Sequence, residues 1–546
     1  MSDSALFPYQ FINEFRGNDF SEFIKTGINV LITTTIKDSF SDDGIEIGVI
    51  ERVKLLNLYC NKSHCSITPR AEKVIDAVKG NTLLVTLIAG IVKKRQYESE
   101  NILQELLYDF EILEVERERD FVEDQGGRVR GNDTIYNHLK IVFNIAEINE
   151  EEWKAMENAI LISNVGISKQ EFFGLTNGDY INEIQSLINK SWICEDELGD
   201  NVQWLSVHPL VREIVYKSEM FVYEDCEKFC KNLYNIVNKV KKENMYNAIA
   251  YSENMFQIFQ LLKRENKLVV WEIGYLLTEI YEETYFQYDR VYNIALDVVQ
   301  GIEIWKPHSI KDRIKRCRMI NGSAYSLLHT RTEDNNKKKD EYNAAKKYLE
   351  YASSELSKII GSSKEECYEQ QVVKALIHGN KGAYYRGLVQ FGNDIEKNIE
   401  NALKEHNQGL ECRNELLKDY PEKEAELNSL IATSYHCIGY DYFAVNNFES
   451  ALENHKNAEK LRKDIYQKHK TVGQKDKWIQ SCSMICNTIQ NMEQVTEEDL
   501  NLYCDKVKVL EQFYRELNDE NRLKNLSKNY EEMSRKFDLP SNIYEI

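Results

Sequence analysis

The sequence predicts a mainly α-helical chain in which a small helix–hairpin module precedes a long array of paired helices. From Val222 onward, almost every segment has the spacing of apolar side chains that indicates amphipathic helices. A β-hairpin pattern interrupts the helical periodicity near residues 192–205. Near the N-terminus, the apolar, β-branched run over residues 27–35 is typical of a strand buried in a parallel sheet. We interpret that run as the remnant of an α/β domain.

These patterns divide the chain into regions of different character. The predicted order is a remnant of an α/β domain, a helical region, a helix–hairpin module and a repeat array, with bounds at 1–60, 61–145, 146–220 and 221–546.

The helix–hairpin module begins with a helical pattern that includes Trp153 and Met156. Two β-like runs, 192–194 and 202–205, flank a polar turn, and Pro209 suits the first turn of the helix that follows. Two or three short helices followed by a hairpin predict a winged-helix module.

The clearest repeat unit runs from Ala432 to Asp464, with Asn446-Asn447 as the predicted turn between its two helices. Its small and aromatic positions are Tyr435, Ile438, Gly439, Tyr442, Ala451 and Ala458. The string over residues 402–406 closely matches that over 451–455, and both end in a histidine where a large packing residue is expected. We predict about five helix pairs and a capping helix over Glu520–Phe537.

The composition limits the classes of partner. Lys+Arg 69 against Asp+Glu 89 leaves an acidic chain, which argues against a broad nucleic-acid or anionic-membrane surface. The longest apolar run, Leu83–Val92, is far shorter than the ~20 residues that span a bilayer. The twelve cysteines are scattered without zinc spacing, and the N-terminus lacks a basic, apolar leader, so we expect a reduced cytoplasmic location and no metal.

The repeat resembles the tetratricopeptide family, whose small and aromatic positions are met by the residues listed above for the unit at 432–464. The resemblance implies a solenoid of helix pairs whose first helices line a groove that binds a peptide or protein. Candidate partner-binding residues on first helices are Asn380, Tyr384, Arg386 and Tyr440.

The region before Val222 resembles the C-terminal part of an NB-ARC module, the nucleotide switch of STAND-type signalling ATPases. Residues 30–34 are similar to the family's sensor strand, 80–84 to its glycine-leucine segment, and 207–210 to its winged-helix histidine motif. The resemblance implies that His208 faces bound ADP and that Thr33 and Thr34 lie near a γ-phosphate. A histidine that only fixes the wing-to-helix junction is the alternative for His208.

The departures from the family affect the nucleotide site. No GxxxxGKS or GxxxxGKT loop occurs, and no apolar strand ends in paired aspartates. Thr35 stands where arginine is usual, and fewer than thirty residues precede Val30, too few for the missing elements. We therefore expect no catalytic residues and no cofactor in this chain alone, with ADP or ATP bound only together with a P-loop-containing partner chain.

Three hypotheses follow for function. The leading one is a cytosolic STAND-type sensor or regulatory scaffold that binds a peptide or protein through its repeats, with the winged helix relaying that event. The second is a split NTPase switch completed by a separate Walker-containing chain or by self-assembly. The third is a transcriptional regulator that acts through a partner, because the helix over 179–190 has two acids and one base and direct DNA contact is disfavoured.

Overall fold

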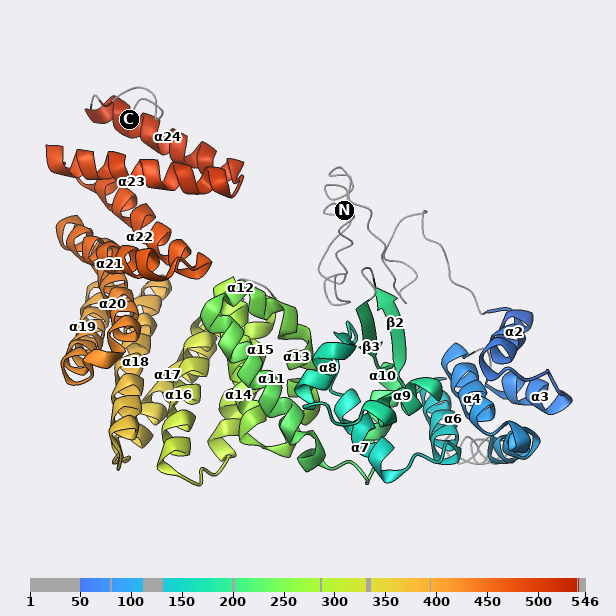
Figure 1. Cartoon of the computed structure of the whole chain (residues 1–546). Helices are drawn as coiled ribbons and strands as arrows, with labels where there is room; N and C mark the ends of the chain where they lie inside the picture. The colour runs from blue at the N-terminus through green and yellow to red at the C-terminus, as the bar shows by residue number, and fades with distance from the viewer. Residues whose placement is uncertain are drawn as a thin grey trace. The chain divides into compact units, whose positions relative to one another are not determined.

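The computed structural model describes residues 50–78, 81–110, 131–198, 202–284, 287–329, 335–392, 394–537 and 539 (Figure 1). The chain divides into two compact units, Met1–Val142 and Phe143–Ile546. The strand predicted over residues 27–35 lies outside the described residues. The fold is mainly α-helical with a helical solenoid, as predicted.

The described part of the first unit is helical. Its helices are α2 (Arg52–Ser63), α3 (Pro69–Ala77), α4 (Thr82–Lys94), the short η2 (Gln96–Glu98), a helix over residues 99–110, and the start of α6 (Gly131–Ile145). The Asn81 side chain caps α4 by accepting from the N–H of Leu84 at 3.0 Å. Every residue from Leu87 to Val92 is buried, so this apolar run forms a core helix. Among the described residues, no helix is both long and apolar enough to span a membrane.

A helix–hairpin block, residues 150–217, lies near the start of the second unit. It consists of α7 (Glu150–Ala159), β1 (Ile167–Ser168), α8 (Lys169–Leu175), α9 (Ile181–Asn189), β2 (Cys194–Leu198), β3 (Val202–Ser206) and α10 (Pro209–Lys217). The strands form an antiparallel sheet in the order β1-β3-β2, and Leu205 pairs with both Ile167 and Glu195. The predicted hairpin is confirmed, but its first strand lies later than the predicted run over 192–194 and includes residues 195–198, which the sequence pattern predicts as turn.

One glycine makes this sheet possible. Gly166 has a φ of +87°, and a Cβ there would lie 2.1 Å from the Trp204 ring. The Trp204 Nε1–H donates to the carbonyl of Val165 at 2.6 Å. The indole therefore fixes the approach to β1.

Paired helices make up the rest of the second unit (Figure 1). The leading helices are α11 (Tyr223–Glu243), α12 (Met245–Ala248) and α13 (Ser252–Leu262). The pairs are α14 (Leu268–Thr284) with α15 (Tyr288–Ile304), α16 (Ile310–Ser326) with α17 (Asn335–Ser357), α18 (Lys364–Leu388) with α19 (Ile395–Asp419), α20 (Glu424–Ala444) with α21 (Phe448–His469), and α22 (Val472–Asn491) with α23 (Glu497–Glu516). Each helix packs on the next, and α14, α16, α18 and α20 also pack in succession.

The predicted turn and capping helix are both confirmed. Asn446 has a φ of +60°, and the Asn447 side chain accepts from the N–H of Ser450 at 3.2 Å, which starts α21. The last helix, α24 (Glu520–Phe537), has the predicted bounds and buries Leu526, Tyr530 and Met533 against the preceding pair. The exposed face of α24 is polar.

Candidate functional site

In each helix pair, we call the leading helix the first helix and the other the second helix. The pair α18 and α19 packs against α20, the first helix of the following pair, around a buried carboxylate. Gly382 lets the helices approach, because a Cβ there would lie 2.4 Å from the His406 ring. The His406 ring contacts Asp441 Oδ2 through Nδ1 at 2.5 Å and the carbonyl of Gly379 through Nε2 at 3.1 Å. Arg386 donates to Asp441 Oδ1 at 3.3 Å. Asp441, which is fully buried, thus joins three helices.

The next pair repeats the packing without the carboxylate. A Cβ on Gly439 would lie 2.5 Å from the His455 ring, so the glycine again admits a histidine. The His455 ring meets His436 with 5.6 Å between ring centroids. In the described part of the chain, the ring nitrogens of both histidines are buried without a hydrogen-bond partner. Burial lowers the pKa of His455 to about 4, with a smaller contribution from the Arg462 guanidinium, and burial lowers the pKa of His436 well below its ordinary value.

An arginine follows His406 and His455 seven residues later, and each arginine donates to the first helix of the following pair. Arg413 donates to the carbonyl of Leu430 at 3.1 Å and to the Ser434 hydroxyl. Arg462 donates to the carbonyl of Lys477 at 3.0 Å and to the hydroxyl of Ser481 at 2.9 Å. The two helix pairs therefore make equivalent contacts with the pair that follows each of them.

The four predicted partner-binding residues all lie on first helices. Asn380 donates to the carbonyl of Asn321 on the preceding first helix at 3.3 Å. The guanidinium of Arg386 lies 5.6 Å from the centre of the Tyr440 ring, and its side chain is 31% exposed. Tyr384 is 6% exposed, so its ring offers little surface to a partner. The structure brings Arg386 and Tyr440 together and leaves Asn380 between α16 and α18.

Polar side chains bridge successive first helices. Lys315 of α16 forms an ion pair with Glu272 of α14 at 2.7 Å, and Arg318 of α16 pairs with Glu369 of α18 at 3.3 Å. The Arg318 side chain is 44% exposed and that of Lys315 is 40% exposed. We call this surface the first-helix layer, with the side chains Glu272, Lys315, Arg318, Glu369, Asn380, Arg386 and Tyr440.

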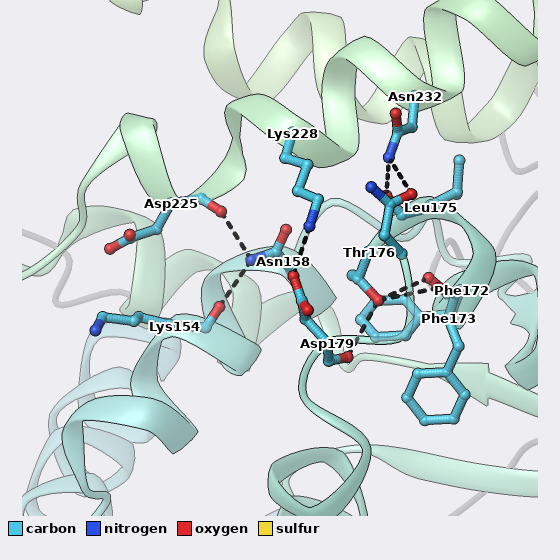
Figure 2. Close-up of polar contacts among 11 residues, drawn as sticks. Lys154, Asn158, Phe172, Phe173, Leu175, Thr176, Asp179, Asp225, Lys228 and Asn232 are labelled. Carbon is cyan, nitrogen blue, oxygen red and sulfur yellow. Dashed lines mark hydrogen bonds and ion pairs between the residues drawn. The ribbon is translucent and has the colours of Figure 1, made fainter.

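A second candidate region joins the helix–hairpin block to α11. Figure 2 shows Asn158 between two carbonyls, and its Nδ2–H donates to Lys154 at 2.9 Å and to Asp225 at 3.0 Å. Lys228 forms an ion pair with Asp179 at 2.7 Å, as Figure 2 also shows. Asn232 donates to the carbonyl of Leu175 at 2.7 Å. We call these contacts, together with those of Glu157 below, the joint.

A buried glutamate lies at the centre of the joint. Glu157 is fully buried, and its Oε1 accepts from the Trp153 indole N–H and from the backbone N–H of Val222, both at 2.8 Å. The same indole N–H also donates to the carbonyl of Met220 at 3.1 Å. Burial raises the pKa of Glu157 to about 7, and the nearby Asp225 carboxylate adds to the rise. The Trp153 indole and the Glu157 carboxyl group together hold the segment between α10 and α11.

The predicted nucleotide-contacting residues are only partly described. Thr33 and Thr34 lie outside the described residues. His208 is exposed and caps α10, because its Nδ1 accepts from the N–H of Leu210 at 3.2 Å. Behind it, the buried Arg212 donates to the carbonyls of Ile160 at 2.9 Å and Ile162 at 2.5 Å. This geometry gives His208 a place in the junction between β3 and α10.

Metal-binding groups are absent from the part of the chain that the structure describes. No cluster of three or more His, Cys, Asp or Glu side chains there could hold a metal ion.

The sequence interpretation missed the buried carboxyl groups of Asp441 and Glu157. Asp441 lies two residues after Gly439 on the buried side of α20, and Glu157 lies four residues after Trp153 on the buried side of α7. An acid at the helical spacing of buried residues signals a buried polar group that needs partners.

Comparison with known proteins finds no family model and no curated protein that matches the chain. Among solved structures, the chain is similar to a Signal Transduction ATPase with Numerous Domains (STAND) protein with a tetratricopeptide repeat sensor from Pyrococcus horikoshii. The two sequences are 14% identical, and the match covers 88% of this chain and 72% of that chain at a TM-score of 0.25. So low a TM-score does not establish a common fold, and the solenoid rests on its own helices and contacts.

Proposed function

We propose that the chain is a STAND-type sensor or regulatory scaffold that binds a peptide or protein through tetratricopeptide-like repeats. The observation that carries the proposal is the first-helix layer. Arginine and tyrosine side chains from successive first helices lie together there and remain partly exposed, as Arg318 and Arg386 do. Arginine and tyrosine are enriched among the residues that contribute most to protein interfaces.

The relay in this proposal runs through the joint. The order of helices and the β1-β3-β2 sheet support the interpretation of the helix–hairpin block as a winged helix. Its first helix, α7, and the turn after α8 both contact α11, where the solenoid begins. A change in the packing of the leading solenoid helices would therefore reach the block directly.

Nucleotide enters the proposal only with a second chain. ADP or ATP would bind where a P-loop-containing partner supplies the phosphate loop that this sequence lacks. His208 would face that partner from the junction between β3 and α10. Denaturing the purified chain and separating the released small molecules tests this part of the proposal, which predicts that the chain alone releases no stoichiometric ADP or ATP.

A peptide selection tests the binding function. Peptides selected from a displayed library on the purified full chain should lose about tenfold or more in affinity on Arg318→Ala or Tyr440→Ala. Lys460→Ala, an exposed change on the second helix α21, is the matched control and should leave the affinity unchanged. Equal losses for all three variants, or selected peptides that bind them all as well as the parent chain, would contradict the proposal.

A further inference from the structure

The joint contains a carboxyl group whose two oxygens have different surroundings. Glu157 Oε1 accepts from the side chain of Trp153 and from the backbone of Val222. Glu157 Oε2 is also buried, but among the described residues it has no hydrogen-bond partner. An ionised carboxylate in such a place keeps a desolvated oxygen without a donor, which is costly.

The charges around Glu157 do not offset that cost. From α11, Asp225 presents a second carboxyl group to Glu157, and the Cys226 thiol donates to the Glu157 backbone carbonyl at 3.4 Å. The nearby lysines are engaged elsewhere, since Lys154 pairs with Glu151 at 3.1 Å and Lys228 pairs with Asp179. Within the described residues, the charged group that acts on the Glu157 carboxyl is therefore another acid.

A comparison within the same helix shows what a paired buried glutamate looks like. Glu152 accepts from Lys190 Nζ at 2.6 Å and from the Ser186 hydroxyl at 2.6 Å, so both of its oxygens have donors. Glu157 lies five residues later, and its charged neighbour is the Asp225 carboxylate, whereas that of Glu152 is Lys190. The sequence thus places one satisfied and one unsatisfied buried acid on α7.

We propose that Glu157 is a protonation switch that sets how tightly the helix–hairpin block is held to the start of the solenoid. In the protonated state, the hydroxyl on Oε2 can donate to the Asp225 carboxylate while Oε1 keeps both of its donors. In the ionised state, two carboxylates face each other across the contact between α7 and α11, and the joint loosens. The proton comes from solvent and returns to it.

The direction of the pH effect follows from the surroundings of the group. Because the folded-state pKa of about 7 lies above the ordinary value for glutamate, the closed joint holds a proton that the open joint has lost between about pH 4.5 and 7. The joint is therefore tightest when Glu157 is protonated and weakens as pH rises. Between pH 6 and pH 8, the opening equilibrium should increase roughly tenfold.

Hydrogen exchange of the full chain tests the switch without any partner. After correction for the intrinsic pH dependence of exchange, protection of the Val222 amide and of the first turn of α11 should fall roughly tenfold from pH 6 to pH 8. Glu157→Gln keeps an acceptor and gains a donor, so its protection should be high and independent of pH. Glu151→Gln, an exposed change on the same helix, should behave like the parent chain.

Two results would overturn the switch. One is parental protection at the joint that does not change between pH 6 and pH 8, and the other is a Glu157→Gln variant that keeps the parental pH dependence. Asp225→Asn provides a second variant, and removal of the like charge should shift the transition to lower pH. The regulatory meaning rests on the proposed relay, but peptide affinity at the first-helix layer is a separate measurement, so the two ideas can fail independently.

Discussion

Two neighbouring helix pairs carry one sequence signature and differ in what their histidine meets. The signature is Ala-Leu, a histidine three residues after the leucine, and an arginine seven residues later, as in 402–413 and 451–462. In the first copy, both ring nitrogens of His406 lie within hydrogen-bond distance of an oxygen, one from Asp441 and one from the carbonyl of Gly379. In the second copy, His455 is buried without such partners among the described residues.

One position on the next first helix accounts for the missing carboxylate in the second copy. Arg413 and Arg462 reach Ser434 and Ser481, which aligns the two helices. Seven residues after those serines stand Asp441 and Thr488. The Thr488 hydroxyl donates to the carbonyl of Met484 on its own helix at 2.7 Å. The same backbone packing thus holds a histidine beside a carboxylate in one copy and a histidine without hydrogen-bond partners, among the described residues, in the next.

Removal of the buried carboxylate should have the largest effect on stability. We expect Asp441→Asn to lower the free energy of unfolding by about 3–5 kcal/mol, because Arg386 then lacks its counter-charge and His406 loses its carboxylate partner. Thr488→Ala, the equivalent change in the second copy, should cost about 1 kcal/mol. Urea unfolding measures both, and equal costs would show that the two copies do not differ as described.

Filling the glycine contacts should affect both copies alike. Gly439→Ala and Gly382→Ala each place a methyl group within 2.5 Å of a histidine ring, and we expect each to cost about 1–3 kcal/mol. Gly473→Ala, in the first turn of α22 with open space around it, should be neutral or stabilise slightly. Thermal unfolding checks these values. A neutral Gly439→Ala would mean that α20 and α21 are not in the close contact described.

Acid should destabilise the chain through the buried histidine of the second copy. The folded-state pKa of His455, about 4, lies below the ordinary value, so the unfolded chain takes up a proton first and stability falls as pH drops below about 6.5. The loss between pH 7 and pH 5 should be about 2 kcal/mol larger in the parent chain than in His455→Phe. Urea unfolding at both pH values measures the difference, which isolates His455 from the opposite effect of Glu157. If the parent chain and His455→Phe lost the same stability between pH 7 and pH 5, His455 would be in contact with solvent.

Helix starts should give the smallest contrast. Asn447 caps α21 through its side chain, whereas Asp394, before α19, has a φ of +43° and no such cap. Asn447→Ala should therefore cost about 1 kcal/mol. Asp394→Gly should be neutral or stabilise, because glycine adopts a left-handed conformation without strain. Calorimetric midpoints decide, and a destabilising Asp394→Gly would contradict this description of the turn.

Features that depend on neighbouring residues could be predicted from the sequence, and features that depend on distant residues could not. The bounds of the capping helix and the turn at Asn446-Asn447 depend on the apolar spacing and turn chemistry of a few neighbouring residues, which the sequence displays directly. The role of Asp441 depends on Arg386, 55 positions earlier, and that of Glu157 on Val222, 65 positions later. Periodicity carries no information on such pairings.

The candidate binding residues show the same limit. Their places on first helices follow from the repeat pattern, but exposure does not, and Tyr384 is buried beside the rings of Tyr342 and Tyr385. Lys315 and Arg318 have no motif that would have identified them. Their proximity to Glu272 and Glu369 follows from the packing of helix pairs on one another.

Side-chain footprinting of the chain with a selected peptide tests the central claim most directly. Hydroxyl-radical labelling of Tyr440, which lies half-buried in the first-helix layer, should fall when the peptide binds. Labelling of Tyr351 and Tyr466, half-buried on second helices, should stay the same. Protection of the second-helix tyrosines with unchanged labelling at Tyr440 would contradict binding at the first-helix layer.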